Sequence, residues 1–334
     1  MQHFEILCAA APKTAMTQTA IPALPARVSI REMGLRDGLQ SISHIMPTEQ
    51  KLTWIKGAWE AGQREIEVGS FVPAKLLPQL TDTAELVAFG KTLPGLTVSV
   101  LVPNMKGAER AMETGAHSML LPLSASHMHS LANMRRTPDE VVADIAKIRA
   151  ARDASGSATK IEIGISTAWG CTIQGDVPHE EVVRLVKAVL DAGVDAVALA
   201  DTVGYADPAM VQRLLDKVLP HTGNTMRGAH FHDTRGLGLA NCLAALQMGM
   251  TQLDASLAGI GGCPHAPGAS GNVNAEDLAF MLQSMGIATG IDFSKLMALR
   301  TQVAQWLQGQ SLQGALWRAG LPKTMNPQAA SACH

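Results

Sequence analysis

Two histidines lie two positions apart in the stretch "GAHFHDTRG", which spans residues 228–236. Residues two apart in a β-strand project to the same face, so His230 and His232 are expected to present their imidazoles side by side. Two imidazoles without partners would be costly inside an apolar shell. The pair is therefore a candidate for metal binding, although the same spacing also occurs in strands where histidines only fill the core or decorate the surface.

Other polar residues near the ends of predicted strands could join this pair. They are, in chain order, Arg36, Asp37, Gln40, Glu67, Asp201, Cys263, His265 and Asn272. Asp37 offers a carboxylate and Asn272 an amide oxygen, in addition to the two ring nitrogens. Such a mixed nitrogen and oxygen set suits a divalent ion such as Mg²⁺ or Mn²⁺ with positions left open for a substrate. We therefore predict Asp37, His230, His232 and Asn272 as metal ligands.

The remaining polar residues each have a functional and a structural interpretation. Arg36 could stabilise a developing oxyanion, or could simply pair with the adjacent Asp37. Glu67 and Asp201 fit supporting partners for Arg36 or for a histidine. Cys263 lies in a segment with five glycines and two prolines between residues 259 and 271. Its thiol could act in proton transfer on a mobile loop, or could be a small buried group.

The elements that must position these residues alternate regularly along the chain, with each short β-branched run followed by a helical stretch. The predicted strands are 28–34, 65–70, 96–102, 117–124, 160–167, 196–202, 229–234 and 253–259. Strict alternation implies parallel strands joined by crossover helices. Eight such units in one chain predict an α/β fold of the closed (β/α)₈ TIM-barrel class.

An open doubly wound sheet is the structural alternative, but no GxGxxG motif follows the first strand. In a barrel the chemistry gathers at the C-terminal ends of the strands, where the polar residues above fall. Strands seven, eight and one are consecutive around a closed barrel. The histidine pair is therefore expected to face Asp37 across a short distance.

The chain divides into three predicted parts. Residues 1–26 are interpreted as a loose N-terminal leader, with Met16 as a possible biological start. Residues 27–320 form a single barrel domain with a helical C-terminal extension, and residues 321–334 a tail. The extension after "EDLAFMLQSMG" (276–286) is expected either to cap the barrel mouth or to form an interface.

Composition excludes several classes of protein. The 334 residues carry a formal net charge of −2, and 47% of them are hydrophobic, so neither a nucleic-acid surface nor a disordered tail is indicated. No run approaches the roughly 18 consecutive apolar residues of a membrane span. Five scattered cysteines without a CxxC motif do not form a disulfide framework. We expect a cytoplasmic protein with no nucleic-acid or membrane partner.

Four motifs carry a resemblance to the hydroxymethylglutaryl-CoA lyase family, a branch of the metal-dependent lyase and synthase barrels. They are "RDGLQ" (36–40), "SFVPAKLLPQLTD" (70–82), "HFHDTRGLGLANCLAALQMG" (230–249) and "AGIGGCPHAPGASGNVNAEDLAFML" (258–282). The last, with a cysteine in a glycine-rich loop, is the most specific. The resemblance extends over about residues 28–290.

The resemblance implies cleavage of 3-hydroxy-3-methylglutaryl-CoA to acetyl-CoA and acetoacetate, with one divalent metal held by the four ligands above. It implies that Arg36 stabilises the thioester enolate and that Cys263 transfers a proton, with Glu67, Asp201 and His230 also at the catalytic site. We expect substrate contacts from Arg36, Gln40, Ser70 and Gly262, and a homo-oligomeric state.

Three segments depart from the family pattern, all on the catalytic rim. His127 stands where an acid is usual, "CTIQG" (171–175) replaces a "CPYEG"-like segment, and Arg235 follows "HDT" where tyrosine is usual. A related 3-hydroxyacyl-CoA with a different substituent at the branching carbon therefore remains an alternative. A condensing acyl-CoA synthase of the same superfamily and a non-catalytic barrel scaffold are the other two.

Overall fold

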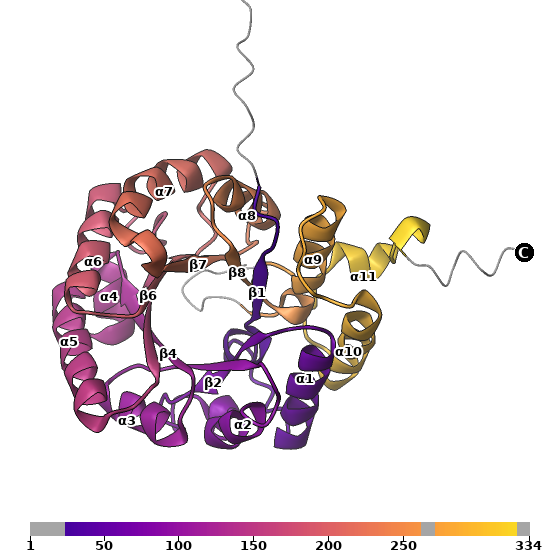
Figure 1. Cartoon of the computed structure of the whole chain (residues 1–334), viewed down its shortest axis with the longest axis horizontal. Helices are drawn as coiled ribbons and strands as arrows, with labels where there is room; N and C mark the ends of the chain where they lie inside the picture. Colours follow the sequence, from indigo (N-terminus) through magenta and orange to yellow (C-terminus); the bar gives the residue numbers. More distant parts are fainter. Residues whose placement is uncertain (1–23, 262–270, 326–334) are drawn as a thin grey trace, which may run out of the picture.

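Eight parallel strands close into a barrel in their order along the chain, as the alternation predicts (Figure 1). The computed structural model describes residues 24–261 and 271–325. The strands are β1 (Ser29–Glu32), β2 (Glu65–Ser70), β3 (Thr97–Leu101), β4 (Ser118–Ser124), β5 (Lys160–Ser166), β6 (Ala196–Asp201), β7 (Met226–Phe231) and β8 (Gln252–Ala255). Strand β8 pairs with β1, which completes the predicted (β/α)₈ barrel.

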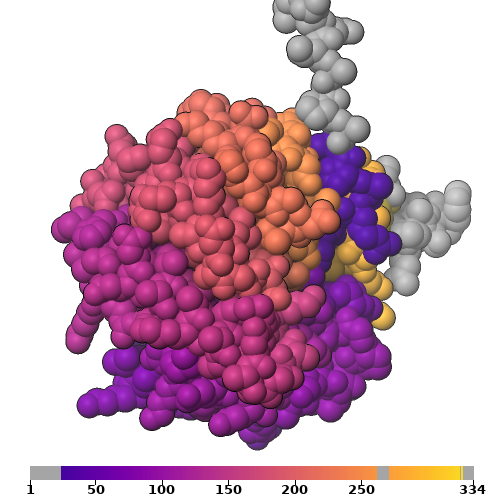
Figure 2. All heavy atoms as spheres, turned by 60° about the vertical axis from the view of Figure 1, so that its left-hand side comes forward, coloured from indigo at the N-terminus to yellow at the C-terminus, as the bar shows by residue number. Residues whose placement is uncertain are grey.

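Helices follow the strands and cover the outside of the barrel. They are α1 (Thr48–Glu60), α2 (Thr83–Gly90), α3 (Met105–Thr114), α4 (His127–Met134), α5 (Pro138–Ser155), α6 (His179–Asp191), α7 (Pro208–Thr222), α8 (Gly238–Gln247), α9 (Ala275–Ser284), α10 (Phe293–Trp306) and α11 (Ala315–Ala319). In the space-filling view, successive segments form adjoining bands over this surface (Figure 2).

Local sequence signals set the helix ends. Helix α5 begins with a capping box, in which Thr137 accepts from the backbone N–H of Glu140 while the Glu140 carboxylate accepts from that of Thr137. It ends at Gly156, whose φ of 67° lies in the left-handed region that glycine adopts without strain.

Successive side chains of each strand point alternately to the two faces of the sheet, so one set meets the surrounding helices and the other meets the barrel lumen. In β5, Ile161, Ile163 and Ile165 are fully buried in the hydrophobic core between strands and helices. The alternate residues face the barrel lumen, where Glu162 bonds Arg31 and Gly164 lines a cavity. The packed apolar layer thus holds the strands rigidly while the lumen carries polar side chains.

Two strand ends differ from the sequence expectation in ways that shape the site. Strand β1 ends at Glu32 rather than residue 34, because Gly34–Gly38 forms a single π-helical turn in which the N–H of Gly38 reaches the carbonyl of Met33. Strand β7 ends at Phe231, so His232 lies just beyond it, in an isolated bridge with Asn272. Single π-helical turns are frequent at functional sites.

The C-terminal extension contributes to the mouth of the barrel. Helix α10 packs against α1, and α11 packs against α9, on the side of the barrel beside β1 (Figure 1). Between them, Gln310 and Ser311 line the cavity at the mouth. Within the described residues, no helix has both the length and the apolar character needed to cross a membrane.

Candidate active site

The histidine pair faces the carboxylate of Asp37, as predicted. The Nε2 atoms of His230 and His232 lie 3.0 Å apart, and His232 Nε2 lies 3.7 Å from Asp37 Oδ2. Potential ligand atoms of these three residues all fall within 4.8 Å of one another. Strand β7 and the π-helical turn after β1 therefore deliver two imidazoles and one carboxylate to the same point.

Asn272 completes this group from the segment that follows β8. Its Nδ2 donates to Asp37 Oδ2 at 2.7 Å and to the carbonyl of Ile260 at 3.1 Å. Its Oδ1 is buried and has no hydrogen-bond partner among residues 24–261 and 271–325. Because a buried polar atom without a partner is costly, this amide oxygen is best explained as a group that binds something.

The donor set fits a divalent metal ion. Neighbouring ligands of an octahedral ion with bonds of about 2.1 Å lie about 3 Å apart, which matches the spacing of the two Nε2 atoms. Burial would raise the pKa of Asp37, but the Arg36 guanidinium and the two histidines outweigh it and hold this pKa well below its usual range. Asp37 is therefore ionised, as a metal ligand must be.

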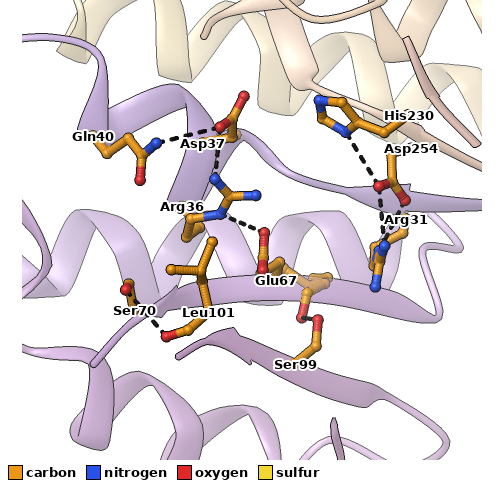
Figure 3. Close-up of polar contacts among 12 residues, drawn as sticks. Arg31, Arg36, Asp37, Gln40, Glu67, Ser70, Ser99, Leu101, His230 and Asp254 are labelled. Atoms are coloured by element: carbon orange, nitrogen blue, oxygen red, sulfur yellow. Dashed lines mark hydrogen bonds and ion pairs between the residues drawn. The ribbon is translucent and has the colours of Figure 1, made fainter. Parts of the chain in front are cut away.

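Arg36 is held at the site by two carboxylates (Figure 3). Its Nε donates to Glu67 Oε2 at 2.5 Å, and its Nη1 donates to Asp37 Oδ1 at 2.6 Å. Its Nη2 makes no hydrogen bond with a described residue, and the side chain lines the cavity. Gln40 Nε2 approaches Asp37 Oδ1 at 3.4 Å. Arg36, Asp37, Glu67 and Gln40 thus form one contiguous polar group.

Asp201 and Ser70 occupy different positions from this group. Both Asp201 oxygens accept backbone N–H groups, from Tyr205 at 2.8 Å and Ala206 at 3.1 Å, which shapes the loop after β6. The Ser70 hydroxyl donates to the carbonyl of Leu101 at 3.1 Å and accepts from the N–H of Val72. Neither residue lines the cavity, so each supports a rim loop. Gly262, Cys263 and His265 lie outside the described residues.

The structure adds three residues that the sequence analysis left unassigned: Arg31, Glu162 and Asp254. Asp254 Oδ2 lies 3.2 Å from Nδ1 of His230. Arg31 bonds Asp254 from one side and Glu162 from the other. In the sequence, each of the three appears as a charged residue inside a predicted strand. Such a residue is unusual, because the strands of a buried parallel sheet are normally continuous apolar runs.

A cavity of about 1220 Å³ opens over the site at the mouth of the barrel. Arg36, Asp37, His230, His232 and Asp254 are among the residues that line it. A volume of this size accommodates more than a drug-sized ligand. The site is therefore accessible to a large, charged molecule that enters from the mouth.

The rim residues that depart from the family pattern do not line this cavity. Gln174 accepts from the Ser126 hydroxyl at 3.1 Å and from the backbone N–H of Met128 at 3.3 Å, which fastens the loop after β5 to the start of α4. Arg235 donates to the carbonyls of Val203 and Gly204 and stacks on Tyr205. His127 is exposed at the first turn of α4. These departures connect rim loops to one another.

Known proteins with related sequences share this architecture. The HMGL-like family model matches residues 27–303. The hydroxymethylglutaryl-CoA lyase YngG of Bacillus subtilis is 38% identical over 284 residues, which are 85% of this chain and 93% of that protein. The mitochondrial hydroxymethylglutaryl-CoA lyase of Homo sapiens is 36% identical over 294 residues, 88% of this chain and 90% of that protein.

A solved structure gives the same match in three dimensions. An HMG-CoA lyase from Acinetobacter baumannii, in complex with coenzyme A and 3-methylmalate, superimposes with a TM-score of 0.84 at 38% identity. The match covers 90% of this chain and 98% of that one. The family model and these relatives extend over most of the chain, including the strands that carry the site, and the chain therefore belongs to the HMGL-like family.

Proposed function

We propose that this protein is a carbon–carbon lyase that cleaves 3-hydroxy-3-methylglutaryl-CoA into acetyl-CoA and acetoacetate. The observation that carries the proposal is the convergence of Arg36, Asp37, His230 and His232 at the mouth of a closed barrel. Curated relatives with more than a third of their residues identical bear this activity in their names. A non-catalytic scaffold is disfavoured, because it would have no reason to retain at Asn272 a buried amide oxygen that no described residue satisfies.

The reaction is a retro-Claisen (retro-aldol) cleavage. The 3-hydroxyl loses its proton, the bond between C2 and C3 breaks, and C3 becomes the ketone carbon of acetoacetate. The electron pair of that bond passes to C2 and gives the enolate of acetyl-CoA, which takes up one proton at C2. The overall reaction needs no oxidant or co-reactant, so the site must remove one proton, stabilise one enolate and return one proton.

Arg36 is placed to stabilise the enolate. Its Nη2 makes no hydrogen bond within the described part of the chain, while Nε and Nη1 are fixed by Glu67 and Asp37, so the guanidinium is oriented before substrate binds. A guanidinium held in this way presents positive charge to a developing oxyanion without reorganisation. Glu67 therefore acts through Arg36, as a residue that sets its orientation.

Asp37, His230, His232 and Asn272 would hold the divalent metal, Mg²⁺ or Mn²⁺. A bound ion there would favour the alkoxide form of a coordinated hydroxyl. Proton return to C2 is assigned to Cys263 on the strength of the sequence resemblance. Asp201 supports the loop after β6 beside the histidines, and Ser70 supports the loop after β2.

Acyl-CoA is the proposed partner, and the cavity suits it. The related structure from Acinetobacter baumannii is described as a complex with coenzyme A. In the present chain, the lumen beside the site is lined by Gly164, Ala198 and Ala200 from β5 and β6. The small size of these side chains is the observation behind the second candidate, a related 3-hydroxyacyl-CoA with a different substituent at C3. A homo-oligomeric state, a cytoplasmic location and a leader before residue 27 stay predictions from the sequence.

A panel of 3-hydroxyacyl-CoA thioesters, assayed for acetyl-CoA release, tests the proposal. We expect turnover of 3-hydroxy-3-methylglutaryl-CoA, loss of activity on treatment with EDTA, and recovery with Mg²⁺ or Mn²⁺. Turnover only of an analogue with a larger C3 substituent would favour the second candidate. Full activity in the chelated protein would refute the metal role, and inert thioesters throughout the panel would refute the lyase.

A further inference from the structure

The barrel lumen directly below the site contains buried charges. The lumen of a TIM barrel is commonly filled by branched apolar side chains. Here Arg31, Glu162 and Asp254 are at most 8% exposed and fill it instead. A buried charge is costly without a partner, so each of these groups must be paired and held in place.

The three residues are joined by short, well-directed bonds. Arg31 Nε donates to Asp254 Oδ1 at 2.8 Å and Arg31 Nη2 donates to Asp254 Oδ2 at 3.0 Å, which is a bidentate pair. Arg31 Nη1 also donates to Glu162 Oε2 at 3.0 Å. Because Arg31 lies on β1 and Glu162 on β5, this guanidinium spans the lumen from one wall to the opposite wall.

The same chain of contacts continues to a predicted metal ligand. Arg31 is in register with Asp254 on β8, and Asp254 is in register with His230 on β7. Asp254 Oδ2 lies 3.2 Å from His230 Nδ1 (Figure 3). Three neighbouring strands thus align a guanidinium, a carboxylate and an imidazole in one layer of the barrel.

This alignment determines which nitrogen of His230 is free. Asp254 is an anionic acceptor in this pair, because both of its oxygens accept from the Arg31 guanidinium in the bidentate ion pair. An ionised carboxylate only accepts hydrogen bonds, so Nδ1 of His230 carries the proton in this pair. Nε2 is then left with its lone pair directed toward His232 and Asp37.

We propose that Asp254, itself fixed by Arg31, is a positioning residue that sets the orientation and tautomer of His230 for binding the shared ion. The inference rests on the metal site of the proposed function and extends it to residues that do not touch the ion. Partners of this kind typically change metal affinity by 10- to 100-fold when they are removed.

The test is the affinity of the EDTA-treated protein for Mn²⁺, measured by isothermal titration calorimetry. We expect Asp254→Asn to bind Mn²⁺ at least 10-fold more weakly than the wild type, because a carboxamide does not impose one tautomer on His230. Asp82→Asn is the matched control. Asp82 is also an aspartate paired with a buried cation, because Lys51 Nζ lies 2.7 Å from its Oδ1, but this pair lies at the start of α2 and not beside His230, so its loss should leave the Mn²⁺ affinity unchanged.

A second variant and a kinetic measurement keep the proposal testable if Asp254→Asn fails to fold. Arg31→Lys retains a cation beside Asp254 but loses the bidentate geometry, so we expect a smaller weakening of Mn²⁺ binding in the same direction. Acetyl-CoA release by either folded variant should recover when Mn²⁺ is raised above the Kd of that variant, which a general loss of structure would not allow.

The outcomes separate this inference from the proposed function. If the wild type binds Mn²⁺ and the folded variants bind it equally well, the positioning role of Asp254 is wrong and the metal site stands. If the wild type binds neither Mn²⁺ nor Mg²⁺, the proposed metal site is wrong and the positioning role falls with it.

Discussion

Glu32 is a buried carboxyl group that forms no ion pair with a described cation, and this makes the stability of the barrel depend on pH. It is 1% exposed at the end of β1. Its oxygens accept from the backbone N–H groups of Gly34 at 2.7 Å and Leu257 at 3.1 Å. Burial raises the pKa of Glu32 to about 8, with a smaller contribution in the same direction from Glu276.

The sign of the effect follows from the two states of the protein. In the unfolded chain Glu32 has its ordinary pKa, near 4.5, so between that pH and about 8 the folded protein binds a proton that the unfolded chain has released. The free energy of unfolding is therefore highest below the unfolded pKa and falls as the pH rises toward 8. For one group with these pKa values, the loss between pH 6 and pH 8 is roughly 2 kcal/mol.

Glu32→Gln tests this reasoning, because glutamine imitates the protonated acid and keeps an oxygen for the two backbone donors. We expect the free energy of unfolding of the variant to fall less steeply, so that its difference from the wild type shifts in favour of the variant by roughly 2 kcal/mol from pH 6 to pH 8. Reversible urea unfolding followed by tryptophan fluorescence measures it.

Glu140→Gln is the control for this measurement. Glu140 is an exposed capping residue whose pKa is lowered, chiefly by the backbone N–H of Thr137, so it stays ionised across this pH range. Its replacement should displace the curve without changing its slope. Parallel curves for the wild type and Glu32→Gln would show that Glu32 does not hold a proton in the folded protein.

Three further substitutions separate chemistry from support. Arg36→Lys should lower acetyl-CoA release by about 100-fold or more without unfolding the protein, since lysine cannot hold Glu67 and Asp37 on separate nitrogens; near-normal kcat would contradict the role of the guanidinium. Arg235→Ala should reduce the free energy of unfolding by about 1 kcal/mol, because the stacking on Tyr205 and the hydrogen bonds of Arg235 are lost. Its KM for the thioester should stay within about threefold of wild type, whereas a tenfold rise in KM would place Arg235 in the substrate site. Thr137→Ala should cost about 1 kcal/mol in thermal unfolding and leave kcat unchanged, as the loss of a capping box predicts.

The sequence predicted which side chains of the candidate site lie together, because its signals are local. The period-two spacing of His230 and His232 fixes their common face, and the alternation of strands and helices requires parallel pairing. Closure of the barrel then brings Asp37 beside the histidines, as expected. The sequence was less accurate about strand ends, because the turn at Gly34–Gly38 and the bridge between His232 and Asn272 depend on contacts between distant segments.

Only the tertiary structure decided which charges support the site. Arg31, Glu162 and Asp254 are separated by more than 90 residues in the chain, and their pairing depends on the register around the closed barrel. The same register turns Asp201 and Ser70 toward backbone groups and Arg235 toward Tyr205. The sequence by itself thus determined the fold class and the residue types at the site, since periodicity is a property of neighbours along the chain. Closure of the barrel decided the partners, because strand stagger selects which side chains meet across the lumen.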